Sequence, residues 1–473
     1  MITFFKQAFW TSLNVNFTTA LNFFVIIILA RILSPETFGI YVFYVATKEI
    51  IANFCSPSLT QTFLYSSGNK INFKNVCKLN FLFSALILIV SVICSLIFKI
   101  FKSDDFYYIL IIFGFVTIIN NFASIFLSTL EKKMNFKKAS VIRSLSISIS
   151  LILTIIIAFI YKDNIHVLVF KEVIFSTLLL IISSKYMFSY NENTHDRKVE
   201  SKNDLIILLN YSFRSYFPKL TEALSYKIFD IMVSQIYGKY LLALFYQSIN
   251  IIRIPYKFLG SVTDNLLFVH VKNKSKNTNK ISEFYQLQLL ILLFTIPIVI
   301  IFNKYSYIIV NILLGNQWIE MSSALGSISM FLIILPLHNS LVTIYQAYDN
   351  QKYYTLSNCM IVIIQIALLN ILEINLINLM NSFCFSFYFA TLFLGYNLKI
   401  NKDFNRTNQY KILFLVSVIF FLILTFTFYK NNIFIILLIF IWILIFKNQF
   451  TFIKKIFNIF KKKINDRIIN SSK

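Results

Sequence analysis

Apolar segments long enough to cross a lipid bilayer follow one another along almost the whole chain, with charged residues gathered in the short loops between them. Residues 21–30, 81–93, 147–160, 286–302 and 412–427 are such segments or the cores of longer ones. A helix of roughly 20 apolar residues spans the hydrocarbon of a bilayer. Taking charges and turn residues as boundaries, we predict an all-α polytopic membrane protein with about 14 transmembrane helices.

Composition supports this prediction and narrows the kinds of site to expect. The chain is 58% hydrophobic and 14% charged, with a mean hydropathy of +0.72, whereas ordinary soluble domains carry about 25% charged residues. We therefore expect no separate water-soluble domain. The five cysteines show no paired spacing, and the sequence contains no HExxH, CxxC or P-loop pattern. We expect neither a metal nor a cofactor.

The basic residues indicate which side of the membrane each loop occupies. Of the 44 Lys and Arg residues, we assign roughly 30 to inner loops and helix ends and about 7 to outer loops. The inner clusters lie at residues 70–78, 132–143, 185–202, 272–280 and 399–411. Because cytoplasmic loops carry the excess of positive charge, we predict that both termini are cytoplasmic. Topology and contact with anionic membrane lipids then account for most of the net charge of +24, and nucleic acid is not needed as a partner.

Two stretches about 200 residues apart in the sequence resemble each other, which indicates an internal repeat. Phe38-Gly39-Ile40-Tyr41 aligns with Tyr237-Gly238-Lys239-Tyr240, and each is expected to form a glycine turn before an apolar helix. Six predicted spans separate the stretches, so the repeat is parallel, with a pseudo-two-fold axis along the membrane normal. The predicted parts are a six-helix lobe at 1–190, a cytoplasmic linker at 191–204, a second six-helix lobe at 205–400, two further transmembrane helices at 401–449 and a basic cytoplasmic tail at 450–473.

Three segments resemble a known family. They are ARILSPETFGIY (30–41), STLEKKMNFKKAS (128–140) and LLGNQW (313–318). They resemble polysaccharide-biosynthesis proteins, the Wzx-type flippases for O-antigen and capsule units in the multidrug/oligosaccharidyl-lipid/polysaccharide (MOP) exporter superfamily. The resemblance implies two six-helix bundles around a central cavity, no enzymatic activity, and a place in the bacterial cytoplasmic (inner) membrane. It also implies an oligosaccharide on undecaprenyl pyrophosphate as substrate, with a polysaccharide polymerase and chain-length proteins as partners.

Charged residues inside the predicted spans are the candidate site, because an ionisable side chain at mid-bilayer costs at least about 2.5 kcal/mol and normally faces a partner or a wet cavity. Arg253, Lys257 and Asp264 in the predicted span 240–269 fall on one stripe of a helix that Pro255 is expected to kink. Such cations suit a pyrophosphate, which needs charge and paired hydrogen bonds once it leaves water.

The preceding span and the first lobe add further charges. The candidate substrate-binding cations are Arg253, Lys257, Lys227, Lys219, Lys48 and Arg214, and the candidate ion-coupling acids, for H+ or Na+, are Asp264, Glu222, Asp230 and Glu49. Lys219 with Glu222 and Lys227 with Asp230 are equally compatible with structural pairs at i,i+3. Lys48 and Glu49 are neighbours on different faces of a helix, so a mutual pair is not expected. Lys171 and Glu172 are the remaining charges of the first lobe.

Three other functions share part of this pattern. A lipid II flippase has the same helix plan and a cationic cavity. A drug exporter of the MATE type typically carries an acid in its first span, where this chain has asparagines instead. A membrane polysaccharide polymerase usually has a sizeable outer loop, whereas the longest outer segment predicted here is about 303–319.

Labelling of single cysteines tests the predicted topology. Cysteines that replace Lys70, Lys202, Lys276 and Lys399 in a cysteine-free variant should react only with reagents that reach the cytoplasm, because all four positions lie in basic loops. Labelling of two or more of these cysteines from outside would contradict both the lobe assignment and the parallel repeat.

Overall fold

A computed structural model describes residues 2–57, 59–65, 73–102, 106–133, 135–191, 209–210, 212–213, 216–272, 280–348, 350–398, 436 and 438–446. Its elements are α1 (Ile2–Ile32), α2 (Pro35–Cys55), α3 (Leu59–Tyr65), α4 (Phe73–Lys102), α5 (Tyr108–Lys132), α6 (Phe136–Ile160), α7 (His166–Asn191), α9 (Tyr216–Ile236), α10 (Gly238–Lys272), α11 (Lys280–Lys304), α12 (Ser306–Leu313), the 3-10 helix η1 (Asn316–Met321), α13 (Ser322–Ser329), α14 (Phe331–Ala347), α15 (Gln351–Ile371) and α16 (Leu376–Asn397). All of these elements are helical, which confirms the predicted fold class.

Many of these helices are long and apolar enough to cross a membrane. Within the described residues, seven qualify singly, namely α2, α4, α5, α6, α7, α15 and α16, and nine spans result if each of two bent helix pairs counts as one. Helix α9 is not among the seven and carries Lys219, Glu222, Lys227 and Asp230 along its length. The count of 14 stays a prediction, and most of the predicted pair at 401–449 lies outside the described residues.

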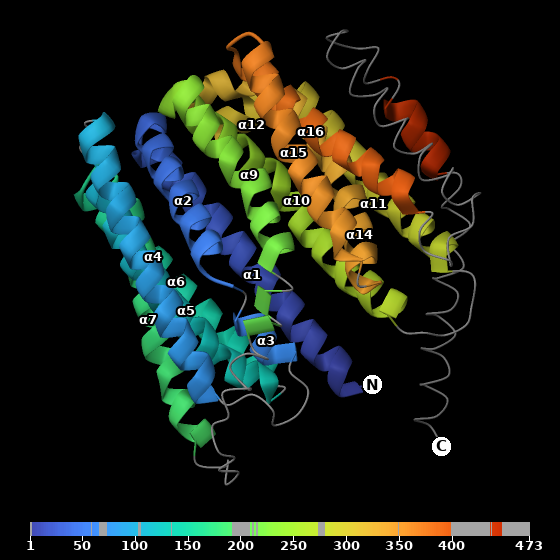
Figure 1. Ribbon diagram of the computed structural model, residues 1–473. Coiled ribbons are helices and arrows are strands. Elements are labelled where there is room, and N and C mark those ends of the chain that lie inside the picture. Colours follow the sequence, from blue (N-terminus) through green and yellow to red (C-terminus); the bar gives the residue numbers. More distant parts are fainter. Residues whose placement is uncertain are drawn as a thin grey trace, which may run out of the picture. The chain divides into compact units, whose positions relative to one another are not determined.

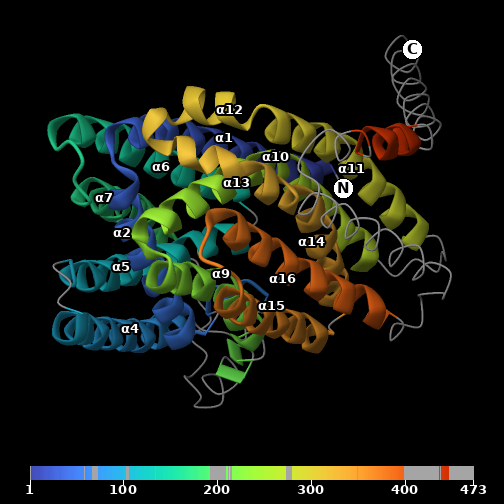
Figure 2. The same cartoon turned by 90° about the horizontal axis from the view of Figure 1, so that it is seen from above.

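The chain divides into two compact units. Unit 1 comprises Met1–Ile254, Val310–Met321 and Asn358–Leu379, and unit 2 comprises Pro255–Ile309, Ser322–Ser357 and Met380–Lys473. In unit 1, α4 packs on α5, α7 packs on both α5 and α6, α1 packs on α6, and α2 packs on α9 (Figures 1 and 2). The division into lobes at the linker 191–204 remains a prediction.

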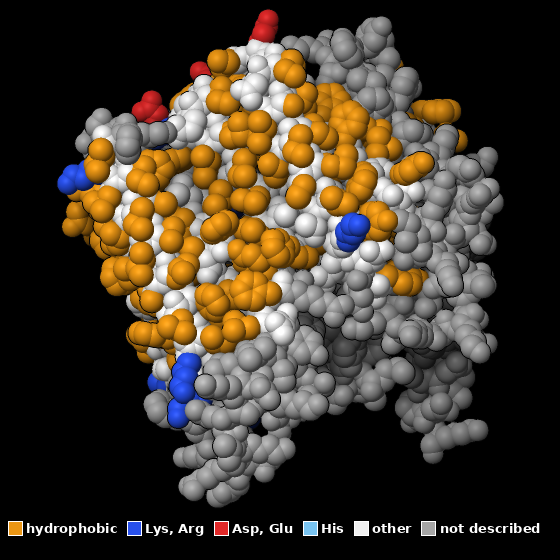
Figure 3. Space-filling model, viewed as in Figure 1, with side chains coloured by type: hydrophobic (Ala, Val, Ile, Leu, Met, Phe, Trp, Pro, Cys, Tyr) orange, Lys and Arg blue, Asp and Glu red, His pale blue; other side chains and the backbone are white. Residues whose placement is uncertain are grey.

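Apolar side chains cover the outward surface of α4 (Figure 3), as expected for a face in contact with lipid. Phe81 and Ile100 are 65% and 73% exposed. On the buried side of the same bundle, several small hydroxyls supply polarity and are satisfied by the carbonyl one turn earlier in their own helix. Ser91 donates to Ile87 O at 2.8 Å and Thr117 donates to Phe113 O at 2.7 Å.

Unit 2 has a core of aromatic rings and small polar side chains. Helix α11 packs on α13 and α14. Phe331 of α14 lies 5.0 Å from Phe383 and 5.1 Å from Phe387, both on α16. Buried His338 approaches the Thr391 hydroxyl at 3.2 Å, and the Tyr345 hydroxyl donates to Leu394 O at 2.9 Å. Hydrogen bonds from α14 to α16 thus satisfy polar groups that water cannot reach.

Helix α2 begins at Pro35, where the Ser34 side chain caps the helix and Asp163 binds the cap residue and Thr37. Ser34 Oγ accepts from Thr37 N at 3.3 Å, and Asp163, in the loop between α6 and α7, accepts from Ser34 N at 2.7 Å and from the Thr37 hydroxyl at 2.8 Å. Partial burial raises the pKa of the Asp163 carboxyl, but these hydrogen bonds outweigh it and bring the pKa below its usual value. Asp163 has a φ of 49°, which Asp tolerates better than most residues.

The repeat prediction was wrong about one of its two glycine turns. Gly238 has a φ of +88° and begins α10, as a turn glycine would. Gly39 lies inside α2, because the Ser34 cap and Pro35 start that helix before it. Gly39 serves close packing instead, since a Cβ built on it would lie 1.8 Å from the Lys239 carbonyl oxygen. Helices α2 and α10 therefore touch backbone to backbone.

Two of the three segments that carry the family resemblance lie against each other in unit 1. The Trp318 indole N–H donates to Ala30 O at 2.7 Å, and the Gln317 amide donates to Leu33 O at 3.1 Å. The Trp318 ring meets the Phe38 ring edge-on, with centroids 5.5 Å apart. The carbonyls at the end of α1 lack partners within the helix, so these side chains act as a cap supplied from a distant part of the chain.

Replacing Gly39 with alanine tests the close approach of α2 and α10. Gly39→Ala should lower stability by about 1–3 kcal/mol or more, because the new methyl group meets backbone atoms that cannot rotate away. Thermal unfolding of the purified protein measures the loss. The control is Gly114→Ala, whose Cβ would lie 3.0 Å from the Ser91 side chain. This variant should lose less stability, because the atom it meets belongs to a side chain. Equal losses for the two variants would contradict the packing argument.

Candidate functional site

Partly or fully buried charges gather within unit 1 around the C-terminal half of α2. Lys48 Nζ lies 3.1 Å from Glu172 Oε2 of α7, and the Tyr41 hydroxyl donates to Glu172 Oε1 at 3.1 Å. The Lys48 ammonium also lies 4.9 Å from the centroid of the Phe113 ring on α5. Tyr41 and Lys48 are two helical turns apart on α2, so they share a face. Both oxygens of Glu172 are therefore satisfied from α2.

The next residue of α2 points toward a different helix. Glu49 Oε2 lies 3.2 Å from Lys227 Nζ of α9, and Asp230 Oδ2 lies 3.5 Å from the same ammonium. Successive helical residues are rotated by about 100°, which is why Lys48 faces α7 while Glu49 faces α9. Lys227 and Asp230 form the i,i+3 pair that the sequence offered as one alternative. Lys48 and Glu49 pair with other helices, in line with the prediction that they do not pair mutually.

Arg253 brings a cation from α10 to the same region. Its guanidinium carbon lies 4.6 Å from the centroid of the Tyr226 ring of α9, a cation–π arrangement. Arg253 also lies within electrostatic range of Asp230. Tyr246 of α10 lies within electrostatic range of both Lys227 and Asp230. Helices α2, α7, α9 and α10 thus all contribute to one polar cluster.

The cluster is close to neutral, with a slight positive excess. Its cations are Lys48, Lys171, Lys227 and Arg253, and its acids are Glu49, Glu172 and Asp230. Desolvated charges are tolerated where opposite charges and hydrogen bonds compensate them. The same arrangement allows an added anion to find cations that are already in place. No group of three or more His, Cys, Asp or Glu residues within the described ranges could hold a metal ion.

The other predicted site residues lie away from this cluster or outside the residues that the structure describes. Lys219 and Glu222 are exposed on α9 and interact electrostatically with each other. Lys257 is exposed on α10, four residues after Arg253. Arg214 and the side chain of Asp264 lie outside the described residues. The structure therefore brings together Lys48, Glu49, Lys227, Asp230 and Arg253 from the predicted set.

Three tyrosines, Lys171 and Glu172 belong to the cluster but were missing from the predicted site. Lys171 and Glu172 were noted only as charges within a predicted span. Tyr41 stands at the end of the ARILSPETFGIY segment, seven residues before Lys48, and this helical spacing could have indicated a shared face. Tyr226 and Tyr246 give no comparable signal, because the chain has 26 tyrosines, and many of them suit the membrane interface.

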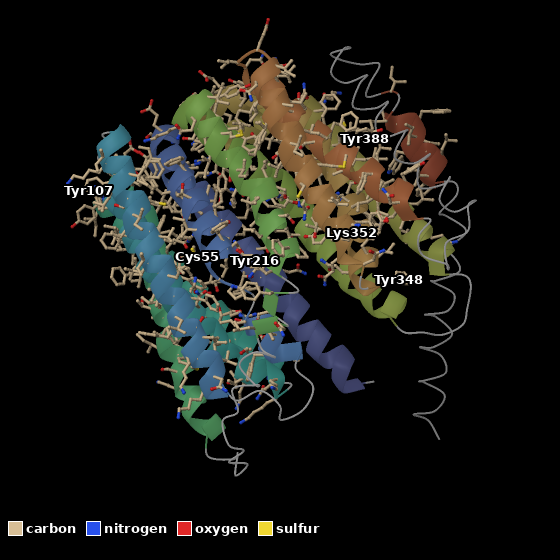
Figure 4. The ribbon with its side chains drawn as sticks, viewed as in Figure 1. Cys55, Tyr107, Tyr216, Tyr348, Lys352 and Tyr388 are labelled. Carbon is tan, nitrogen blue, oxygen red and sulfur yellow. The ribbon has the colours of Figure 1, made fainter. Side chains whose placement is uncertain are left out.

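Helices α2 and α9 remain in contact beyond the cluster, at the end of α2. The Tyr216 hydroxyl, in the first turn of α9, donates to Phe54 O next to Cys55 (Figure 4). The Thr62 hydroxyl of α3 and the Ser212 hydroxyl, four residues before α9, lie 2.9 Å apart. In unit 1, α2 and α9 are thus connected both at the Glu49–Lys227 ion pair and at the C-terminal end of α2.

Comparisons with known proteins place this geometry in a wider group. Residues 28–323 match a family described as polysaccharide biosynthesis protein, and no curated protein matches the chain. The structure is similar to lipid II flippase MurJ in an inward closed conformation, with a TM-score of 0.66, 16% identity and coverage of 94% of this chain and 99% of that chain.

Two further solved structures share the fold. An inward-facing MATE family multidrug resistance transporter of the MOP superfamily has a TM-score of 0.63 at 12% identity, covering 85% of this chain and 95% of that chain. A MOP superfamily transporter from Pyrococcus furiosus has a TM-score of 0.58 at 12% identity, covering 88% and 96%. At these identities the similarity shows the fold, and the fold is that of MOP transporters.

A double-mutant cycle tests whether Lys48 and Glu172 depend on each other. Lys48→Met or Glu172→Gln alone should cost about 3–5 kcal/mol, because each leaves a buried charge without its main partner. The double variant should cost less than the sum of the two. Thermal unfolding of the purified protein gives the three values.

The Arg143–Glu131 pair is the control for this cycle. It joins α6 to α5 at 2.8 Å, with the Arg143 side chain 46% exposed, so its removal should cost at most about 1 kcal/mol. Additive losses at Lys48 and Glu172 would show that the pair is not coupled.

Proposed function

The chain belongs to the family of polysaccharide biosynthesis proteins, and we propose that it is a flippase for oligosaccharide units carried on undecaprenyl pyrophosphate. It is a multi-pass membrane protein with a MOP transporter fold. In the proposal, O-antigen or capsule units enter from the inner leaflet of the bacterial cytoplasmic membrane and leave in the outer leaflet by alternating access. Both termini then lie in the cytoplasm.

The observation that carries the proposal is a cluster of charged side chains among apolar helices, in which cations slightly outnumber acids. Lys48, Lys227 and Arg253 come from three helices of unit 1, and their side chains are at least half-buried. A pyrophosphate must lose its water to cross a layer of low dielectric, and ammonium and guanidinium groups replace that water with charge and directed hydrogen bonds. Cations in this position favour an anionic cargo over a cationic drug.

A lipid II flippase is the second candidate, supported by the similarity to MurJ along 94% of this chain. The same cations would serve a lipid II pyrophosphate equally well, so the cluster does not separate the two cargoes. The neighbouring genes would separate the two cargoes. Genes for glycosyltransferases and nucleotide-sugar enzymes favour O-antigen or capsule units, and murein genes favour lipid II. The family and the similar structures are transporters, which disfavours the polymerase alternative.

Coupling and partners follow from the same proposal. Asp230 lies beside Lys227 within the bundle, so a proton or sodium ion on this acid would change the charge that the cargo meets. Asp264, Glu222 and Glu49 are the other candidate acids. A polysaccharide polymerase and chain-length proteins would receive the exported units in the outer leaflet.

Charge removal at two predicted binding residues tests the proposal. Arg253→Ala combined with Lys257→Ala should abolish surface polysaccharide and accumulate the lipid-linked unit inside, because the pyrophosphate loses two cations on its inward path. Arg253→Lys should retain part of the activity if charge matters more than bidentate geometry.

The amount of protein in the membrane is the control for both variants. Normal surface polysaccharide from the double alanine variant at wild-type abundance would reject the binding role of both residues.

A further inference from the structure

Lys227 contacts two acids that differ in origin and in exposure. Asp230 belongs to the same helix and its side chain is 8% exposed, whereas Glu49 comes from α2 and its side chain is 41% exposed. Lys227 itself is 18% exposed. One ammonium thus has a buried partner on its own helix and an accessible partner on the neighbouring helix.

The two contacts have different structural consequences. The Lys227–Asp230 pair spans less than one turn of α9, so it holds no other helix in place. The Lys227–Glu49 pair joins α2 to α9, which belong to different lobes in the prediction from sequence. Because Asp230 can neutralise Lys227 by itself, the Glu49 carboxylate is a second negative charge on a single ammonium.

We propose that Glu49 is a built-in counter-ion, which holds the place of the cargo's anionic head and is displaced from Lys227 when an isoprenyl pyrophosphate binds. This inference rests on the proposed function and adds a specific event to it. A phosphate oxygen replaces a carboxylate oxygen at the ammonium, so Lys227 keeps a negative partner throughout and no buried cation is left unpaired. Displacement opens the ion pair between α2 and α9.

Glu49 is better suited to this exchange than Glu172, the α7 acid that pairs with Lys48 of α2. Glu172 accepts both from Lys48 and from the Tyr41 hydroxyl, and Lys171 lies within electrostatic range. Its side chain is also less exposed than that of Glu49, at 21%. Displacing Glu172 would break two charge-assisted hydrogen bonds, whereas displacing Glu49 breaks its one ion pair within the described residues. Glu172 therefore anchors α2 to α7 while Glu49 exchanges.

The exchange also gives a criterion for selecting cargo. A neutral isoprenoid has no charge with which to replace the carboxylate, and a cationic compound would be drawn to Glu49 instead of releasing it. Only an anionic head removes Glu49 from Lys227 without cost to the ammonium.

Binding of farnesyl pyrophosphate to the purified full-length protein in nanodiscs tests the inference. Glu49→Gln should bind this probe about tenfold more tightly than the wild type, because the competing charge is gone and a charge-assisted contact is typically worth about one power of ten in affinity. Farnesol, which lacks the pyrophosphate, should bind both proteins equally. Glu36→Gln is the matched control, since it removes an exposed acid from the first turn of the same helix and should leave the affinity unchanged.

The outcomes separate this inference from the proposed function. If the wild type binds farnesyl pyrophosphate and Glu49→Gln binds it no more tightly, the inference is overturned and the proposed function stands. If neither protein binds it, the proposed function fails. A lower melting temperature of Glu49→Gln with unchanged affinity would assign the pair a purely structural role.

A conservative variant separates charge from side-chain length. Glu49→Asp keeps the negative charge and should stay within about threefold of the wild-type affinity. If Glu49→Gln does not fold, Glu49→Ala, which also removes the charge, takes its place and should show the same gain in affinity. A tenfold gain in affinity for Glu49→Asp would show that reach, and not charge, controls binding, and would overturn the inference.

Discussion

A charge placed among apolar helices requires an opposite charge beside it, and this requirement determines where α2 lies in unit 1. Lys48 finds Glu172 on α7, while its neighbour Glu49 finds Lys227 on α9. Two adjacent residues thus connect one helix to two others, because the helical rotation turns them to different sides. The tyrosine hydroxyl at Tyr41 and the rings of Phe113 and Tyr226 complete the environment of these charges.

The sequence predicted the parts of this arrangement that depend on local spacing. The all-α fold follows from hydropathy, and the Lys227–Asp230 pair follows from a separation of three residues on one helix. The Glu49–Lys227 and Lys48–Glu172 pairs join residues far apart in the chain, and only tertiary packing brings them together. The prediction of a glycine turn at Gly39 was wrong because its role also depends on tertiary packing. The Ser34 cap and Pro35 begin α2 before this position, and Gly39 allows close contact with α10.

The segments that resemble other family members gain a physical meaning from their contacts. Residues 30–41 end one helix and begin the next, and residues 313–318 supply Gln317 and Trp318 to the buried carbonyls of Ala30 and Leu33 at that junction. An indole N–H is a donor on a large apolar ring, so it can satisfy a carbonyl while packing against Phe38. Gln317, Trp318 and Phe38 thus have a structural role in one joint contact between the two segments, independently of any cargo.

This contact has a consequence for how the protein is made. The Trp318 donor and the Ala30 acceptor are 288 residues apart, and bacterial or eukaryotic ribosomes add about 5–20 residues per second. The end of α1 therefore waits roughly 15–60 s after its own synthesis before its partner exists. Throughout that interval water or a membrane-insertion factor must satisfy those carbonyls, and a ribosome that stalls before residue 318 leaves the end of α1 without its cap.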